Sequence, residues 1–177
     1  MSTSTSISNH DPRREKIVVY GPPHAGKTTA IHKIKHRLGG TLGIFKGTAE
    51  KFESALQMGF PPATVVLAGL ALDTKVGDVG CRILSVTGSL IDNRMWLRLL
   101  EGASGVIYAT GGPRVDDLAS YTAILKEHLS TCPDTAVCVI RTRPDLGPYV
   151  SPSKIGVDCS IFDVNSNQPE CYIAPLE

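Results

Sequence analysis

Ile17-Val-Val-Tyr-Gly-Pro-Pro-His-Ala-Gly-Lys-Thr-Thr29 decides the fold: it is an apolar run followed at once by the pattern G-x-x-x-x-G-K-T from Gly21 to Thr28. This pattern is typical of the Walker A phosphate-binding loop, which needs a strand before it and a helix after it. Residues 17–20 are β-branched and aromatic, as in a buried strand, and the residues from Ala30 onward have helical spacing. This context favours a phosphate site over a chance match in a glycine-rich chain.

The chemistry of such a loop comes from its backbone. Two glycines let the chain curl so that successive N–H groups and the positive end of a helix face one anion. In this pattern Lys27 reaches the β- and γ-phosphates, Thr28 offers its hydroxyl to Mg²⁺, and Thr29 lies beside the α-phosphate. The predicted nucleotide-binding residues of the loop are Gly21, His24, Ala25, Gly26, Lys27, Thr28 and Thr29.

Length and composition suit one globular domain. The chain has 177 residues, of which 42% are hydrophobic and 20% charged, enough for one sizeable core. We expect a disordered polar tail over residues 1–14, which show no apolar periodicity, and a single domain over residues 15–177. The formal net charge of +1 gives no argument for a nucleic-acid partner or for an anionic membrane surface.

Cysteine usage and hydropathy predict a cytoplasmic protein. The five cysteines are odd in number and form no C-x-x-C pair, so reduced, mostly buried thiols are expected instead of a disulfide framework or a zinc site. The N-terminus has no apolar segment of the signal-peptide kind. The longest apolar stretch, near residues 63–72, is too short for a transmembrane segment.

The helix expected after the loop is strongly basic. It should run from Lys27 to about Leu38 and end at Gly39-Gly40. Its basic cluster has two interpretations: a solvated helix face, which we favour, or a patch for an acidic partner or lipid head groups. The cluster consists of His32, Lys33, Lys35, His36 and Arg37.

The middle of the chain predicts a long loop and a hairpin. Residues 41–62 contain three glycines and end at Pro61-Pro62, so an irregular segment with a short helix near residues 48–58 is expected, and it is a candidate nucleotide-sensing loop. A strand over residues 63–72, a turn over residues 74–80 and a strand over residues 81–87 would follow, giving one antiparallel edge strand.

The second half predicts alternating helices and strands. This alternation indicates a three-layer α/β fold with a mainly parallel, doubly wound sheet, whose ligands bind at the carboxyl ends of the strands. The expected elements are a helix over residues 92–101 with Trp96 in its apolar stripe, strands over 105–110, 136–140 and 157–164, and a helix over 115–129.

In this order the chain resembles the Ras-like small GTPases of the P-loop NTPase class, and most closely the bacterial MglA-type polarity GTPases near the Arf branch. The resemblance covers about residues 16–146. Besides the Walker A loop, it rests on Ala63-Thr-Val-Val-Leu-Ala-Gly-Leu-Ala-Leu72, Leu84-Ser-Val-Thr-Gly-Ser89, Leu99-Leu-Glu-Gly-Ala-Ser-Gly-Val-Ile-Tyr108 and Arg143-Pro-Asp-Leu146. It implies a GTP-binding switch with GTP or GDP and Mg²⁺ as cofactors.

The resemblance extends to two residues near the γ-phosphate. Thr64 matches the switch threonine that meets Mg²⁺ in the family, although a β-branched residue also opens a strand without any such role. Gly88 matches the glycine whose backbone N–H approaches the γ-phosphate. The expected metal ligands are therefore Thr28 and Thr64.

Residues that support hydrolysis in the family are absent at the matching positions. Ser85 replaces the usual Asp, as a hydroxyl residue also does in MglA-type proteins, and Ser89 replaces the Gln that orients water. Ala63 replaces the arginine that precedes the switch threonine. We therefore assign no catalytic residue and expect slow or absent intrinsic hydrolysis.

Base recognition retains one residue of its motif. The family's N-K-x-D corresponds to Thr142-Arg143-Pro144-Asp145. Asp145 could accept hydrogen bonds from guanine N1 and N2 while the stem of Arg143 lies along the ring, or residues 145–148 could be a plain turn; both alternatives stay open. The final family motif has its best counterpart in Asn165-Ser166-Asn167.

The C-terminus is too short for the usual last helices of the family. Residues 147–156 are proline-rich, and only residues 165–177 follow the last expected strand. The sheet face left open could be covered by the tail or by another chain, for example in a dimer.

The leading hypothesis is a GTP-binding switch or scaffold, with a roadblock-type protein or another effector as partner. One alternative is a P-loop ATPase or phosphotransferase, because the loop alone does not select the base or the acceptor. Another is a pseudo-GTPase that acts only as an interaction module.

Overall fold

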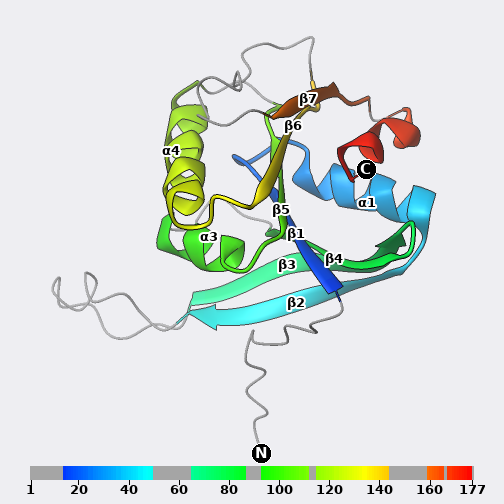
Figure 1. The fold of residues 1–177 in the computed structure, drawn as a ribbon, viewed down its shortest axis with the longest axis horizontal. Helices are drawn as coiled ribbons and strands as arrows, with labels where there is room; N and C mark the ends of the chain where they lie inside the picture. The colour runs from blue at the N-terminus through cyan, green and yellow to red at the C-terminus, as the bar shows by residue number, and fades with distance from the viewer. Residues whose placement is uncertain are drawn as a thin grey trace, which may run out of the picture.

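A computed structural model describes residues 14–49, 65–86, 93–111, 115–143, 159–165 and 167–176 of the chain. In these residues, seven strands form one sheet in the order β2-β3-β4-β1-β5-β6-β7 (Figure 1). The strands are β1 (Arg14–Tyr20), β2 (Thr41–Ala49), β3 (Val65–Val76), β4 (Val79–Val86), β5 (Gly105–Ala109), β6 (Ala136–Arg141) and β7 (Ser160–Asp163). The helices are α1 (Lys27–Leu38), α3 (Asn93–Leu100), α4 (Val115–Thr131) and the 3₁₀ helices η2 (Pro169–Tyr172) and η3 (Ala174–Leu176).

The sheet is mainly parallel, as expected. β4, β1, β5, β6 and β7 pair in parallel with one another in that order, so their carboxyl ends meet at one edge of the sheet. The expectation of a single antiparallel edge strand is wrong, because β2 runs antiparallel to β3, and β3 runs antiparallel to β4. The hairpin turn between β3 and β4 is also shorter than expected, since only Gly77 and Asp78 lie outside the strands.

β2 is the largest difference from the sequence expectation. Residues 41–49 were expected to be irregular and then helical, but they pair residue by residue with β3, from Thr41 opposite Asp73 to Ala49 opposite Val65. Gly69 of β3 makes room for this strand, because a Cβ there would lie 2.5 Å from the Phe45 ring. The rest of the expected helix, residues 50–58, lies outside the described residues.

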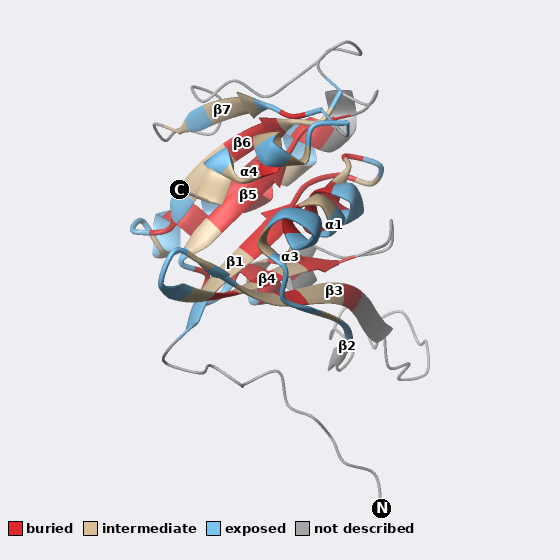
Figure 2. Ribbon diagram, turned by 90° about the vertical axis from the view of Figure 1, so that its right-hand side faces the viewer, coloured by how far each residue is buried: buried red, intermediate tan, exposed pale blue. Residues whose placement is uncertain are grey.

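Two layers of helix cover the sheet (Figures 1 and 2). Successive residues of a strand point to opposite faces, so Val18 and Tyr20 of β1 pack in the core with α3 and α4, while Val19 packs in the core with α1. Trp96 is 1% exposed and belongs to the first of these cores, as its place in the apolar stripe predicts. The arrangement confirms a three-layer α/β architecture.

The C-terminal tail covers part of the sheet face beside α1. η2 packs against α1, and its Tyr172 is buried in the α1 core together with Val164. The Cys138 thiol donates a 3.7 Å hydrogen bond to the Pro175 carbonyl. The tail is one of the two covers expected for this face, and it packs there as short 3₁₀ helices.

Other boundaries differ by a few residues. α3 begins at Asn93 and α4 extends to Thr131, while the last strand is shorter than the expected 157–164. All five cysteines are free thiols, but only Cys81 is buried, so the expectation of mostly buried thiols is wrong. No helix in the described ranges is long and apolar enough to cross a membrane.

Candidate functional site

The loop Gly21–Gly26, here called the glycine-rich loop, leaves the carboxyl end of β1 and leads into α1. β1 lies between β4 and β5, so the loop lies at the middle of the sheet edge where parallel strands end. In α/β sheets this edge is where ligands bind. Ala30 N donates a 2.9 Å bond to Gly26 O, as expected for Gly26 as the N-cap residue that precedes α1.

The loop backbone is left-handed at two positions. Gly26 has φ 81° and ψ 13°, and His24 has φ 62°, a conformation that is uncommon for a residue with a side chain. Such strain is found mostly where a loop serves a binding site. Gly26 has no side chain to cap α1 and the first turn of the helix holds no acidic residue, so neither supplies a partner for the first N–H groups. These donors, at the positive end of the helix, favour an anion.

Lys27 is a buried cation without an acidic partner in the described part of the chain. Its side chain is 7% exposed, and its Nζ donates hydrogen bonds to Gly21 O at 2.9 Å and to Pro22 O at 2.6 Å. Burial lowers the pKa of Lys27 to about 8. Carbonyl oxygens compensate only part of the cost of burying the ammonium group, whereas an anion would compensate it more fully.

Two strand ends hold the loop in place. The Thr142 hydroxyl, just beyond β6, donates a 3.0 Å hydrogen bond to Ala25 O. A Cβ at Gly26 would lie 2.9 Å from the Thr142 Cγ2 atom. A Cβ at Gly111, beyond β5, would overlap the Thr142 hydroxyl, and one at Gly21 would overlap the Ala109 carbonyl. The loop is therefore packed so closely against the ends of β5 and β6 that glycine is required at these contacts.

The loop residues predicted from sequence lie together, with different exposure. His24, Thr28 and Thr29 are exposed, Ala25 and Lys27 are buried, and Arg143 is exposed one residue beyond Thr142. Thr28 is the second residue of α1, so its hydroxyl lies in the uncapped first turn. Three other predicted site residues, Thr64, Gly88 and Asp145, lie outside the described residues, as do Ala63 and Ser89. Asn165 Oδ1 accepts a 2.9 Å bond from Asn167 N, which is a local turn contact.

Ser85 is buried near the carboxyl end of β4. It is fully buried, and its Oγ has no hydrogen-bond partner among the residues that the structure describes. The register pairs Leu84 with Val18 of β1, so Ser85 lies beside the strand that leads into the loop. An unsatisfied buried hydroxyl is costly unless a ligand or a water bonds to it.

The described residues are compatible with a Mg²⁺ nucleotide. They contain no cluster of three or more His, Cys, Asp or Glu side chains that could hold a metal by themselves. Mg²⁺ bound to a nucleotide needs no such cluster, because phosphates and waters supply most of its ligands and one or two protein oxygens complete them. The hydroxyl of the exposed residue Thr28 suits that role.

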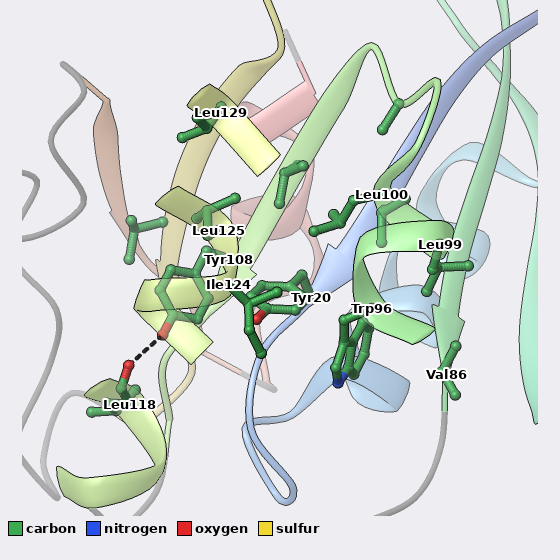
Figure 3. Packing of buried hydrophobic residues seen from close by; sticks show 14 residues of the cluster. Tyr20, Val86, Trp96, Leu99, Leu100, Tyr108, Leu118, Ile124, Leu125 and Leu129 are labelled. Carbon is green, nitrogen blue, oxygen red and sulfur yellow. Dashed lines mark hydrogen bonds between the residues drawn. The ribbon is translucent and has the colours of Figure 1, made fainter. Parts of the chain in front are cut away.

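An aromatic cluster supports the strand that leads into the loop (Figure 3). Tyr20, the last residue of β1, packs edge to face against Trp96 with ring centroids 4.7 Å apart, and it also contacts Tyr108 and Tyr121. Its hydroxyl donates a 2.8 Å bond to Tyr121 O of α4. Burial raises the pKa of Tyr20, so this hydroxyl stays protonated as a structural donor. The cluster fixes the direction in which β1 enters the loop.

A surface groove lies away from this site. It has a volume of about 370 Å³ and is lined by the C-terminal ends of α3 and α4, including Glu101 and His128. These ends precede β5 and β6, so the groove lies at the amino end of the sheet, opposite the glycine-rich loop. Burial and the nearby Lys16 lower the pKa of His128, whose Nε2 is 3.2 Å from the Thr135 hydroxyl. This histidine has a structural partner and no place in the loop's chemistry.

Sequence reasoning assigned no role to two residues that shape the site, Thr142 and Gly111. Thr142 was aligned with a base-recognition motif and given no contact of its own. A signal for both existed in the sequence, because each follows a predicted buried strand whose carboxyl end must lie near the loop.

A scan against protein-family models and a search of curated proteins found no match to this chain.

Proposed function

We propose that this protein binds a nucleoside triphosphate, GTP in preference to ATP, together with Mg²⁺ at the glycine-rich loop, and acts as a nucleotide-dependent switch or scaffold. The observation that carries the proposal is Lys27, a buried lysine whose ammonium group bonds, among the residues that the structure describes, to two carbonyl oxygens of the loop. Beside it, the start of α1 is uncapped. A phosphate would bring negative charge to both features at once.

Each loop residue has a role in this proposal. The backbone N–H groups around Gly26 and the first turn of α1 would bind the phosphate oxygens. Lys27 would leave the loop carbonyls and bond to the β- and γ-phosphates, and Thr28 would bind Mg²⁺. Thr64 and Gly88 are proposed near the γ-phosphate, and Arg143 and Asp145 near the base, on the resemblance to Ras-like GTPases. A bound Mg²⁺ supplies charge neutralisation between the phosphates.

Isothermal titration with GTP, GDP and ATP, with and without Mg²⁺, tests the proposal. We expect a triphosphate to bind more tightly with Mg²⁺ and GTP to bind more tightly than ATP. Lys27→Ala should abolish binding and leave the circular dichroism spectrum unchanged. A matched control is Lys33→Ala on the same helix, whose side chain is partly exposed and should not affect binding.

The outcomes separate the proposed function from its alternatives. Equal affinity for ATP and GTP would favour an ATPase or phosphotransferase. No binding by the correctly folded wild-type protein would leave an interaction module that no longer uses the loop. Equal affinity of wild type and Lys27→Ala for a triphosphate would exclude the glycine-rich loop as the site.

A further inference from the structure

The solvent-facing side of α1 carries lysine, arginine and histidine side chains and no acidic residue. Successive residues of an α-helix are 100° apart, and the side toward the sheet holds Ala30, Ile31 and Ile34, which are buried. The opposite side is coloured as exposed in Figure 2. The basic cluster lies outside the buried side: His32, Lys35 and His36 are exposed, Lys33 is partly exposed, and Arg37 is exposed in the last turn. α1 contains no Asp or Glu.

These charges are not used within the described fold. None of the five makes an ion pair with any residue that the structure describes, whereas Arg14 and Arg82 both bond to Asp73. A basic last turn offsets the negative end of a helix, which accounts for Lys35, His36 and Arg37. His32 and Lys33 lie one turn earlier, where that effect has faded. The cluster therefore exceeds what the helix itself requires.

A large apolar side chain projects from the sheet on the same side as α1. Ile44 of β2 is 72% exposed. Leu42, two residues earlier on the strand, packs in the α1 core, and so does Leu70, which pairs with Ile44 across the sheet. Because alternate residues of a strand share a face, Ile44 points to the face that α1 covers. Basic and exposed apolar side chains thus occur together there.

We propose that this surface, the basic face of α1 together with Ile44, binds the surface of an anionic lipid bilayer. The cluster occupies residues 32–37, about 9 Å of the helix, and successive residues project 100° apart around the axis, so the side chains do not converge on one point. Such a spread matches a continuous layer of anionic head groups better than the single carboxylates of an acidic peptide. Ile44 can enter the head-group boundary, as apolar side chains of peripheral proteins do. The inference does not depend on what the glycine-rich loop binds.

Co-sedimentation with vesicles tests this inference. The protein should bind vesicles of phosphatidylcholine that contain about 30% phosphatidylserine, and it should not bind vesicles of pure phosphatidylcholine. The reason is that each Lys or Arg near an anionic surface increases partitioning about fivefold. Lys35→Gln/Arg37→Gln should therefore reduce binding about 25-fold. Ile44→Ser should reduce it about fivefold or more, because less apolar surface is buried.

The matched control is Arg98→Gln/Lys126→Gln. It removes two exposed charges from α3 and α4, on the other face of the sheet, and changes the net charge equally. We expect less than a twofold effect, with circular dichroism reporting the fold of every variant. Equal binding to neutral vesicles, an equal loss in the control, or binding of poly-glutamate or RNA without binding of anionic vesicles would each overturn the inference.

Discussion

At the scale of single residues, the buried charge of Lys27 lowers the stability of the ligand-free protein and favours the binding of an anion. Its ordinary pKa of 10.5 falls to about 8 because the ammonium group loses water on burial. Between these two pH values the unfolded chain binds more protons than the folded protein, so the free energy of unfolding rises with pH in this window. The gain reaches about 1.4 kcal/mol per pH unit. The buried charge thus destabilises the ligand-free protein below pH 8, and a bound phosphate would offset that cost.

We predict that Lys27→Met makes the ligand-free protein more stable than wild type at pH 7, and that the difference shrinks between pH 8 and pH 10. Methionine has a similar length and removes the buried charge. Urea unfolding of both proteins at several pH values measures the difference, in which the titrations of other groups cancel. A difference that stays constant over this range would show that Lys27 keeps its proton at high pH.

At the scale of elements, the site depends on contacts between strands that are far apart in sequence. Thr142, after β6, bonds to Ala25 in the loop after β1, a separation of 117 residues. We predict that Thr142→Val, which keeps the side-chain shape and removes the hydroxyl, weakens triphosphate binding about tenfold. The Ala25 carbonyl would lose its hydrogen-bond partner, and the loop would lose its contact with the end of β6. Calorimetric titration measures the change.

The control for this prediction is Thr142→Ser, which retains the hydroxyl and loses a methyl group. We expect the serine variant to bind within about threefold of wild type, because a retained hydrogen bond accounts for most of the difference. Equal weakening in both variants would assign the effect to packing against Gly26, and no weakening in either would show that the loop holds its shape without β6.

The sequence predicts best those elements whose pattern is local. The strand, loop and helix around Gly21–Thr29 follow from the β-branched run, the glycines and the helical spacing, and α3, α4, β5 and β6 follow from periodicity within a few residues. β2 was missed because Gly43 and Gly47 weaken its strand pattern. It forms because β3 is long enough to pair with all nine of its residues, which is information that residues 41–49 do not carry.

For the candidate site, too, the residues of a local motif could be predicted from the sequence and the contacts between distant strands could not. The phosphate-binding residues lie within one continuous motif, so they could be named from the sequence. The contacts of Thr142 and Gly111 could not, because they depend on which strands lie next to β1. The orphaned hydroxyl of Ser85 also appears only when β4 is placed beside β1.

At the scale of the whole molecule, the two faces of the sheet are covered by different elements. α3 and α4 enclose the aromatic cluster on one face, while α1 and the short C-terminal tail cover the other. Tyr172 carries much of the tail's contact, since it is 2% exposed in the α1 core. The tail thus stabilises α1, the helix whose first turn follows the glycine-rich loop.

Tyr172→Ala is predicted to destabilise the protein by about 3 kcal/mol, the usual cost of deleting a large buried side chain. Thermal unfolding measures the loss, and Tyr172→Phe, which keeps the ring, serves as the control and should cost less than about 1.5 kcal/mol. Because α1 would lose support, triphosphate affinity should fall in the alanine variant as well. An unchanged melting temperature would mean that the tail adds nothing to the fold.

The last prediction concerns the rate of hydrolysis. Phosphoryl transfer depends on orienting the attacking water and on neutralising charge at the γ-phosphate, and an arginine finger is worth about 10³ to 10⁵ in turnover. At the positions where the Ras-like GTPases that the chain resembles have the arginine and the water-orienting glutamine, the sequence has Ala63 and Ser89. Arg82, one arginine that could act in cis, bonds to Asp73 in the first half of β4, away from the carboxyl end of the sheet. Single-turnover hydrolysis of GTP by the protein alone should therefore be at or below roughly 10⁻³ s⁻¹. Turnover of about 1 s⁻¹ would contradict this predicted rate. Arg94 and Arg114 would then be the residues to replace.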